Sequence, residues 1–254
     1  MKILALDTSS NACSAALLQG NQQDFSCIER FEIAPRQHTQ LILPMIDSVL
    51  DEADYDISQI DVLAFGRGPG AFTGVRVATG VVQAIAYGAD IAVAQISSLA
   101  AIAQGFYNTH GCSHAQGCSG KNDKLLVAND ARMDEIYFAA YEMNKDFMTL
   151  TGREQVLKPE RLAAVLDNSI DLNDSWMTVG NGWSVYSEAL SPIADQCGLS
   201  TDMSEMANDH SYPHARDIAF LAFKEAAGKT LVSAEKVSPV YLRDNVAKKS
   251  KKQL

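Results

Sequence analysis

The sequence has little of what marks several large classes of proteins. Its five cysteines are odd in number and scattered along 254 residues, which is not the pattern of a disulfide framework. No stretch approaches the roughly 20 apolar residues that a membrane-spanning helix needs. The apolar run at the N-terminus is interrupted by Asp7, which leaves it too short for a signal peptide. We therefore expect a soluble, cytoplasmic protein with no membrane partner.

Positive charge is also scarce. The chain has 21 lysines and arginines against 31 aspartates and glutamates, a formal net charge of −10. Binding to nucleic-acid phosphates needs clustered lysine and arginine, so a large nucleic-acid surface is not expected. The one basic cluster is terminal and is interpreted as a solvated tail: Lys248, Lys249, Lys251 and Lys252. If the protein serves an RNA, we expect it to act through a partner.

Several catalytic signatures are missing as well. Neither the metalloprotease pattern His-Glu-x-x-His nor the serine hydrolase pattern Gly-x-Ser-x-Gly occurs. One cluster has the residue types of zinc ligands: His110, Cys112, His114 and Cys118. Its spacing fits no standard zinc finger, and its glycine- and serine-rich surroundings indicate a surface loop. We expect no structural metal site there, which disfavours a zinc peptidase.

The sequence does contain the composition of a globular protein, with 47% hydrophobic and 20% charged residues. Apolar periodicity in the first hundred residues predicts strands at 2–7, 12–18 and 24–33, a helix at 39–53, a strand at 60–65, a helix at 75–87, a strand at 91–94 and a helix from Ser97. Thr39 is the expected N-cap of the first helix, and Pro44 predicts a kink or a start near it. This βββαβαβα order is that of a ribonuclease-H-like α/β unit, with a largely parallel sheet and helices on both faces.

The second half of the chain has weaker patterns. They predict a loop at 107–122, strands at 125–128 and 136–141 around a turn at 129–134, a helix at 159–165, a strand at 176–179 and a helix at 214–227 that Gly228 ends. We interpret the chain as two lobes, 1–106 and a degenerate second lobe at 107–212. Residues 213–254 then form a C-terminal helix that packs on the first lobe, followed by a tail.

A glycine-rich turn at residues 66–74, here called the glycine turn, joins a strand to a helix. Such a turn can present backbone N–H groups to an anion, which makes Gly68 and Gly70 candidate nucleotide contacts. However, no Gly-Lys-Ser/Thr follows, and Thr73 occupies the place of the third glycine in a dinucleotide fingerprint. The alternative is a tight turn that packs closely, and the motif chemistry favours it. Asp7, at the end of the first strand, has the place of a metal-associated acid in actin-like kinases, or is a capped turn.

The helix after the glycine turn carries Gly80, Ala84 and Gly88 four residues apart. Small residues at this spacing form a shallow groove that a second helix can approach closely. Val77, Val81 and Ile85 supply a second, apolar edge of the same helix. The groove fits either packing within the protein's own core or an interface with another subunit, and the sequence leaves both open.

Several segments, taken together, carry a family resemblance. They are residues 2–9 (KILALDTS), 38–44 (HTQLILP), 68–76 (GPGAFTGVR), 97–99 (SSL), 130–137 (DARMDEIY) and 239–243 (PVYLR). In this order they resemble the TsaB (YeaZ) family, a glycoprotease-like branch of the actin/Hsp70 ATPase (ASKHA) superfamily. The resemblance implies an actin-like, two-lobed fold.

The resemblance also implies a role. TsaB proteins are the non-catalytic partners of TsaD, which transfers a threonylcarbamoyl group to adenosine 37 of tRNAs that read codons starting with A. The ATPase TsaE joins the pair, so ATP or ADP and a metal are implied in the partner complex and not in this chain by itself. The tRNA is then an indirect partner, and a homodimer is the expected state of the chain alone. A stand-alone actin-like nucleotide-binding enzyme is the alternative function.

The catalytic relative holds a metal with two histidines four residues apart near the start of its third helix. Ser97 and Ala101 stand at those places here, and neither side chain can replace an imidazole. The relative's glycine pair near its nucleotide has only a poor counterpart at residues 179–183. We therefore predict a chain without its own catalysis that docks TsaD through its first two helices. The predicted interface residues are Leu41, Ile42, Met45, Val77, Gly80, Val81, Ala84, Ile85 and Gly88.

Overall fold

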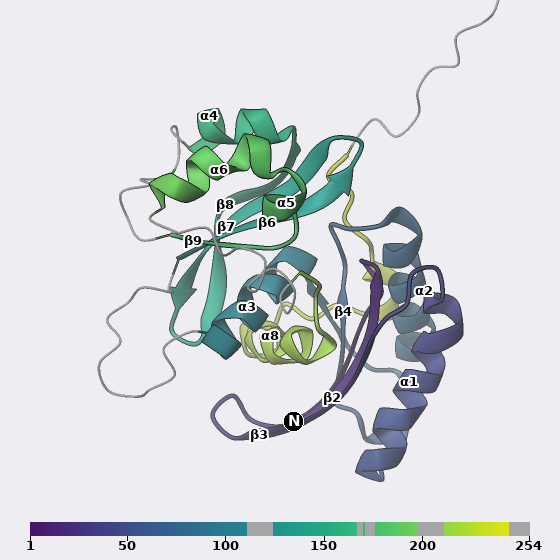
Figure 1. Cartoon of the computed structure of the whole chain (residues 1–254). Helices are drawn as coiled ribbons and strands as arrows, with labels where there is room; N and C mark the ends of the chain where they lie inside the picture. The colour runs from purple at the N-terminus through teal and green to yellow at the C-terminus, as the bar shows by residue number, and fades with distance from the viewer. Residues whose placement is uncertain (111–123, 167–169, 171–175, 198–210, 244–254) are drawn as a thin grey trace, which may run out of the picture.

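A computed structural model describes residues 1–110, 124–166, 170, 176–197 and 211–243. The described chain forms two β-sheets with helices between them and on both outer faces (Figure 1). The layers run from helices α1 and α2, through the first sheet, to helices α3 and α8, then to the second sheet and its outer helices. None of the helices described is long and apolar enough to cross a membrane.

The first sheet has the strand order β3-β2-β1-β4-β5. Its strands are β1 (Lys2–Asp7), β2 (Ala12–Gly20), β3 (Phe25–Ile33), β4 (Val62–Gly66) and β5 (Val93–Ile96). The helices that alternate with them are α1 (His38–Ala53), α2 (Phe72–Ala89) and α3 (Ser98–His110). β1, β4 and β5 are parallel, and β2 runs antiparallel to its two neighbours. The predicted βββαβαβα order is confirmed.

The second sheet has the order β8-β7-β6-β9. Its strands are β6 (Lys124–Arg132), β7 (Glu135–Asn144), β8 (Phe147–Leu157) and β9 (Met177–Val179). The helical elements of the rest of the chain are η1 (Ile57–Gln59), η2 (Pro159–Arg161), α4 (Leu162–Leu166), α5 (Gly182–Val185), α6 (Ser187–Gln196), α8 (Ala215–Gly228) and η3 (Ala234–Lys236). α4, α5 and α6 bury their apolar residues against the outer face of this sheet.

Some predicted element boundaries are wrong. α1 begins at His38 without a side-chain cap, so Thr39 lies inside the helix, as does Pro44. α3 continues to His110 through residues predicted as loop. α8 is ended by Lys229, which takes the left-handed conformation at φ 58° and donates its N–H to two carbonyls of the last turn, so Gly228 is the last helical residue.

The turn predicted at residues 129–134 is shorter in the structure, because β6 continues to Arg132. Three consecutive residues, Arg132, Met133 and Asp134, have φ between 59° and 63° and reverse the chain into β7. Asp130 Oδ1 accepts a hydrogen bond of 2.8 Å from Arg132 N and thereby supports the turn. Asn129 and Asp130 are strand residues that lie at the end of β6.

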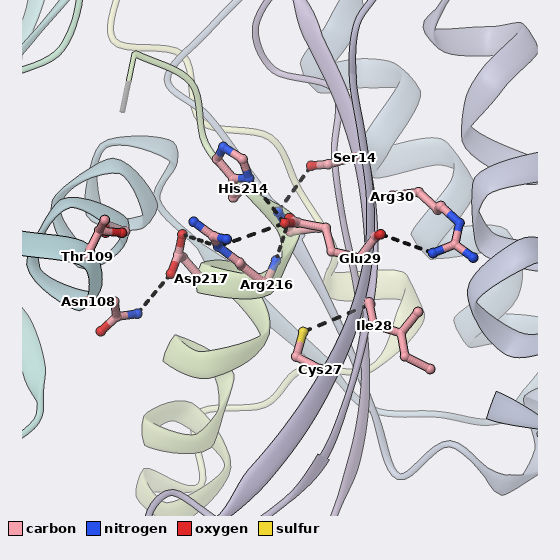
Figure 2. A network of polar contacts seen from close by, with 12 residues as sticks. Ser14, Cys27, Ile28, Glu29, Arg30, Asn108, Thr109, His214, Arg216 and Asp217 are labelled. Carbon is pink, nitrogen blue, oxygen red and sulfur yellow. Dashed lines mark hydrogen bonds and ion pairs between the residues drawn. The ribbon is translucent and has the colours of Figure 1, made fainter. Parts of the chain in front are cut away.

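Helix α8 covers the face of the first sheet opposite to α1 and α2. A polar network fixes its first turn (Figure 2). Glu29 of β3 accepts a hydrogen bond from Arg216 N and lies 3.2 Å from the imidazole of His214. Asn108 of α3 donates to Asp217, which joins α8 to α3. The last helix of the described chain therefore packs on the first sheet.

The second sheet is attached near both ends of β7. Beyond its C-terminal end, Gln104 of α3 accepts a hydrogen bond of 2.8 Å from Met148 N. At its N-terminal end, residues 237–243, here called the C-terminal segment, cross from the first sheet to the β6–β7 turn (Figure 1). Val240 N donates to Arg67 O at 2.8 Å, and Arg243 Nε donates to Glu135 Oε2 at 2.9 Å. Arg243 also donates to two carbonyls of the turn.

Candidate functional site

A small polar cleft lies between the two lobes. Its lining includes Ser9 and Ser10 of the β1–β2 turn, Gly70 of the glycine turn, and Asp130 and Asn181 of the second lobe. The cavity volume is about 90 Å³, whereas small-molecule sites commonly occupy roughly 300–1,000 Å³. The enclosed part of the cleft is therefore smaller than a typical small-molecule site.

Asp7, the predicted candidate for a metal-associated acid, is enclosed behind the cleft. Its side chain is buried, and Oδ1 accepts hydrogen bonds of 2.9 Å from Ser9 N and 3.0 Å from Ser9 Oγ. Among the residues that the structure describes, none is hydrogen-bonded to Oδ2, which lies against Gly66, where a β-carbon would be 1.8 Å from it. Burial raises the pKa of Asp7 to about 7, against the weaker opposite effect of the Ser9 hydrogen bonds. The carboxyl of Asp7 is therefore buried, whereas a magnesium ligand is commonly reached by solvent water.

The two glycine candidates are occupied by contacts within the chain. A β-carbon at Gly70 would lie 2.3 Å from Ser9 O, and the next residue, Ala71, donates its N–H to that same oxygen at 2.7 Å. Gly68 has φ 101° and lies against Val240 O of the C-terminal segment. Gly70 therefore lines the cleft while its Cα packs against Ser9, and Gly68 is not among the lining residues. The glycine turn packs tightly on the β1–β2 turn, as the tight-turn alternative predicted.

The buried carboxyl of Asp7 gives the first testable prediction. Because its pKa is raised in the folded state, the folded chain binds more protons than the unfolded chain between about pH 4 and 7, and stability falls as pH rises through this range. A shift from 3.8 to about 7 corresponds to about 4 kcal/mol. Urea unfolding should show roughly 2.6 kcal/mol of this loss between pH 5 and pH 8, because the remainder is lost below pH 5. Asp7→Asn should remove most of that change.

Burial also raises the pKa of Asp217, to about 6. This second carboxyl therefore adds to the loss of stability with rising pH, over a lower pH range than Asp7. The matched control is Asp47→Asn, an exposed aspartate on α1, which should leave the pH dependence unchanged. If Asp7→Asn had the pH dependence of the unsubstituted chain, Asp7 would be ionised in the fold and the enclosure argument would be wrong.

Ser97 and Ala101 stand where the catalytic relative is expected to have its two metal-binding histidines, and here both make contacts within the fold. Ser97 precedes α3, and its Oγ accepts hydrogen bonds from the backbone N–H groups of Leu99 and Ala100. The same hydroxyl donates to Glu154 of β8. Ala101 is fully buried in the core between α3, α8 and the first sheet. Neither side chain lines the cleft.

Two other groups of residues noted in the sequence are the segment 179–183 and the cluster of histidines and cysteines at 110–118. Asn181 of the segment 179–183 lines the cleft, but a β-carbon at Gly180 would lie 2.4 Å from Ala128 O, so this glycine serves close packing of the chain. Of the proposed zinc cluster, Cys112, His114 and Cys118 lie outside the described residues, and His110 at the end of α3 stacks on Phe106. The described residues contain no group of three or more side chains suited to a metal.

The small-residue groove of α2 lies on the solvent face. Gly80, Ala84 and Gly88 are exposed, and nothing lies within 4 Å of a β-carbon built at Gly80 or Gly88. Packing within the protein's own core, the alternative left open by the sequence, does not occur there among the described residues. The second predicted edge, formed by Val77, Val81 and Ile85, is half-buried and packs on the core from the side. Leu41 of α1 is half-buried in the same way.

Two of the predicted interface residues are wrong, because Ile42 and Met45 face inward. They are 1% and 9% exposed and pack on the first sheet with Val49. Exposed apolar side chains that the sequence analysis missed take their place: Leu43 of α1 with 50% of its surface exposed, and Tyr87 of α2 with 76%. Their spacing was a usable signal, since Leu43 follows Ile42 on the opposite face and Tyr87 lies three residues after Ala84.

We call the exposed apolar face of these helices the α1–α2 surface: Leu41, Leu43, Val77, Gly80, Val81, Ala84, Ile85, Tyr87 and Gly88. It combines a groove of small residues with large exposed side chains. α2 contains a single charged residue, Arg76. A helix that is apolar on its outer face as well as its inner face is typical of one that is covered by a partner.

Comparison with known proteins gives the family. A family model described as TsaD, tRNA N6-adenosine threonylcarbamoyltransferase, matches residues 31–251. A protein of Escherichia coli K12 named tRNA threonylcarbamoyladenosine biosynthesis protein TsaB is 36% identical over 97% of this chain and 96% of its own length. The chain belongs to the TsaB (YeaZ) family. The protein of the same name from Haemophilus influenzae is 37% identical over 97% of this chain and 95% of its own.

A solved TsaB-family structure confirms the fold. YeaZ from Pseudomonas aeruginosa is 40% identical and superposes with a TM-score of 0.76 over 95% of this chain and 99% of that one. The two-lobed α/β architecture expected from the sequence, with a ribonuclease-H-like order of elements in the first lobe, is therefore that of a solved member of the family. The match to the TsaD model shows that TsaB proteins belong to the wider glycoprotease-like family, as the resemblance implied.

Proposed function

We propose that this TsaB-family chain is the non-catalytic partner and scaffold of TsaD in the synthesis of threonylcarbamoyladenosine at position 37 of tRNAs that read codons starting with A. Its relatives are named for that pathway. The observation that carries the partner role is the α1–α2 surface, on which α2 exposes a nearly uncharged face with an open groove at Gly80, Ala84 and Gly88. Burial of such a surface drives association at about 25 cal/mol per Å² of apolar area.

The groove sets the geometry of the partner. With no side chain at Gly80 and Gly88, a helix from TsaD can lie close to the α2 backbone and extend contact to Leu43 and Tyr87. In the absence of TsaD, we expect two copies of the chain to cover this surface for each other.

The absence of catalysis by the chain alone has three supports. Asp7 is enclosed, Gly70 packs against Ser9, and Ser97 with Ala101 replaces the metal-binding pair. In this proposal ATP or ADP and the metal belong to the complex with TsaD and the ATPase TsaE, in the cytoplasm. Because the chain has a net charge of −10, it is poorly suited to bind the phosphates of tRNA. In this proposal the tRNA binds TsaD, and this chain acts on the tRNA only indirectly. A stand-alone actin-like enzyme would need the cleft to admit a nucleotide.

The test of this proposal is reconstitution, and it is the second prediction. The purified chain alone should transfer no threonylcarbamoyl group to tRNA, cleave no protein and bind no ATP–magnesium in a calorimetric titration. Added to TsaD and TsaE from the same organism, it should raise formation of the modified adenosine at least tenfold. Turnover by the purified chain that Asp7→Ala abolishes would instead identify a self-sufficient enzyme.

A further inference from the structure

One charged residue interrupts the otherwise uncharged outer face of α2. Arg76 is exposed and lies one helical turn after Phe72 and one turn before Gly80. In a chain with a net charge of −10, a lone cation beside an apolar groove is a distinctive feature of the surface. Charges at the edge of an interface serve specificity and register more than bulk affinity.

The guanidinium of Arg76 is held in place by two aromatic rings. It lies 3.8 Å from the centre of the Phe72 ring, and Nε donates a hydrogen bond of 2.9 Å to the hydroxyl of Tyr241. The two rings are 5.4 Å apart, and both are partly exposed. Stacking on one ring and a hydrogen bond to the other fix the plane in which the guanidinium lies.

Tyr241 is itself fixed, because it belongs to the C-terminal segment. The residue before it, Val240, is hydrogen-bonded to Arg67 of the glycine turn, and Arg243 is ion-paired with Glu135 at the β6–β7 turn. Because the chain is held on both sides of Tyr241, the backbone of this residue has a fixed position, from which its hydroxyl accepts the hydrogen bond of Arg76. Segments 165 residues apart in the sequence thus meet to orient one arginine.

The two terminal nitrogens of Arg76 make no hydrogen bond to any residue that the structure describes. Within the described part of the chain, the hydrogen bond from Nε is the one that Arg76 makes through its side chain. A guanidinium fork matches a carboxylate with two parallel hydrogen bonds. Because its orientation is already fixed, binding costs less side-chain entropy than for an unrestrained arginine.

We propose that Arg76, held by Phe72 and Tyr241, binds a single aspartate or glutamate side chain of the partner helix and thereby sets the register of helix pairing in the groove. This inference rests on the proposed function. A protein carboxylate is favoured over an RNA phosphate because α2 contributes a single cation beside an apolar groove, whereas phosphate backbones are bound by clusters of cations.

The experiment measures the affinity of TsaD for the unsubstituted chain and for Arg76→Gln at low and high salt. Loss of hydrogen bonds to a charged group should weaken binding roughly 10- to 100-fold at low salt, and the remaining affinity should depend less on salt. Arg76→Lys, which keeps the charge without the fork, should lie between the two. Arg153→Gln removes an exposed arginine of β8 and should bind as the unsubstituted chain does.

Melting temperatures of the isolated variants separate binding from folding, because Arg76 is exposed and its substitution should leave the fold intact. A matching lysine in place of the TsaD carboxylate should restore binding to Arg76→Glu, which identifies the residue by a charge exchange. If Arg76→Gln bound TsaD as tightly as the unsubstituted chain, or were weakened equally at every salt concentration, the inference would be overturned while the proposed function stood. If the unsubstituted chain did not bind TsaD, both would fail. An effect of Arg76→Gln on self-association alone would also overturn it.

Discussion

Ala84→Arg is expected to weaken TsaD binding by about three orders of magnitude while the isolated chain stays folded. Ala84 lies in the middle of the groove, between Gly80 and Gly88, on the exposed face of α2. A long charged side chain there fills the space that a partner helix needs. It also buries an unpaired charge, at a cost of roughly 3–5 kcal/mol. Since each 1.4 kcal/mol is about tenfold in affinity, this removes most of a typical association.

The measurement is size-exclusion chromatography with TsaD, together with circular dichroism and thermal melting of the chain alone. Ala227→Arg is the matched control, because it makes the same change at an exposed position of α8, away from the α1–α2 surface. It should pair normally. A folded Ala84→Arg chain that still bound TsaD with undiminished affinity would remove this face of α2 from the interface.

Gly70→Ala should destabilise the isolated chain by about 3 kcal/mol, in the range of an overpacked core position. The added methyl group would lie 2.3 Å from Ser9 O and 2.9 Å from Ser9 Cβ, so either the glycine turn or the β1–β2 turn must move. The hydrogen bond from Ala71 N to Ser9 O holds the two turns together and opposes that movement. For a chain of this length the expected fall in melting temperature is roughly 6–12 °C.

Gly80→Ala is the matched control for this change. It adds the same methyl group at a helical glycine with nothing within 4 Å, and it should stabilise the chain by up to about 1 kcal/mol. The comparison is made without nucleotide, so it tests packing and not ligand binding. Equal melting temperatures for Gly70→Ala and the unsubstituted chain would mean that the glycine turn can accommodate an added methyl group. The tight-packing interpretation would then be wrong, and an anion site at this turn would have to be considered.

The sequence predicted the first lobe well because its elements are local. Each strand and helix there has a clear apolar period, and the turns between them carry glycine or polar residues. Helix periodicity also located the apolar stripe of α1 that includes Ile42 and Met45, but it could not say that this stripe faces the sheet. On α2, apolar and small residues occur on every side, so only the packed structure distinguishes the buried Val82 from the exposed Ala84.

What the sequence did not predict depends on contacts between distant residues. β8 was missed because Gly152 interrupts its pattern at a shift in register with β7. The enclosure of Asp7 requires Gly66 of another strand, and the ion pair that closes the β6–β7 turn joins Glu135 to Arg243, 108 residues away. Local propensity carries no information on such pairs. The proposed role as a partner of TsaD comes from the family resemblance. The structure adds that the groove of α2 is on an exposed face.

The attachment of the second sheet near both ends of β7 has a mechanical consequence. Proteins that close around a ligand bend at a hinge on one side of a cleft while the other side opens freely. Here Gln104 with Met148 at one end and Arg243 with Glu135 at the other are separated by a strand of 10 residues, about 33 Å long. If the second sheet rotated about one attachment, the residues at the other attachment would move far, because they lie a whole strand away. The hydrogen bonds there would then break. We therefore expect the two lobes to keep the same angle to each other whether the chain is free or assembled.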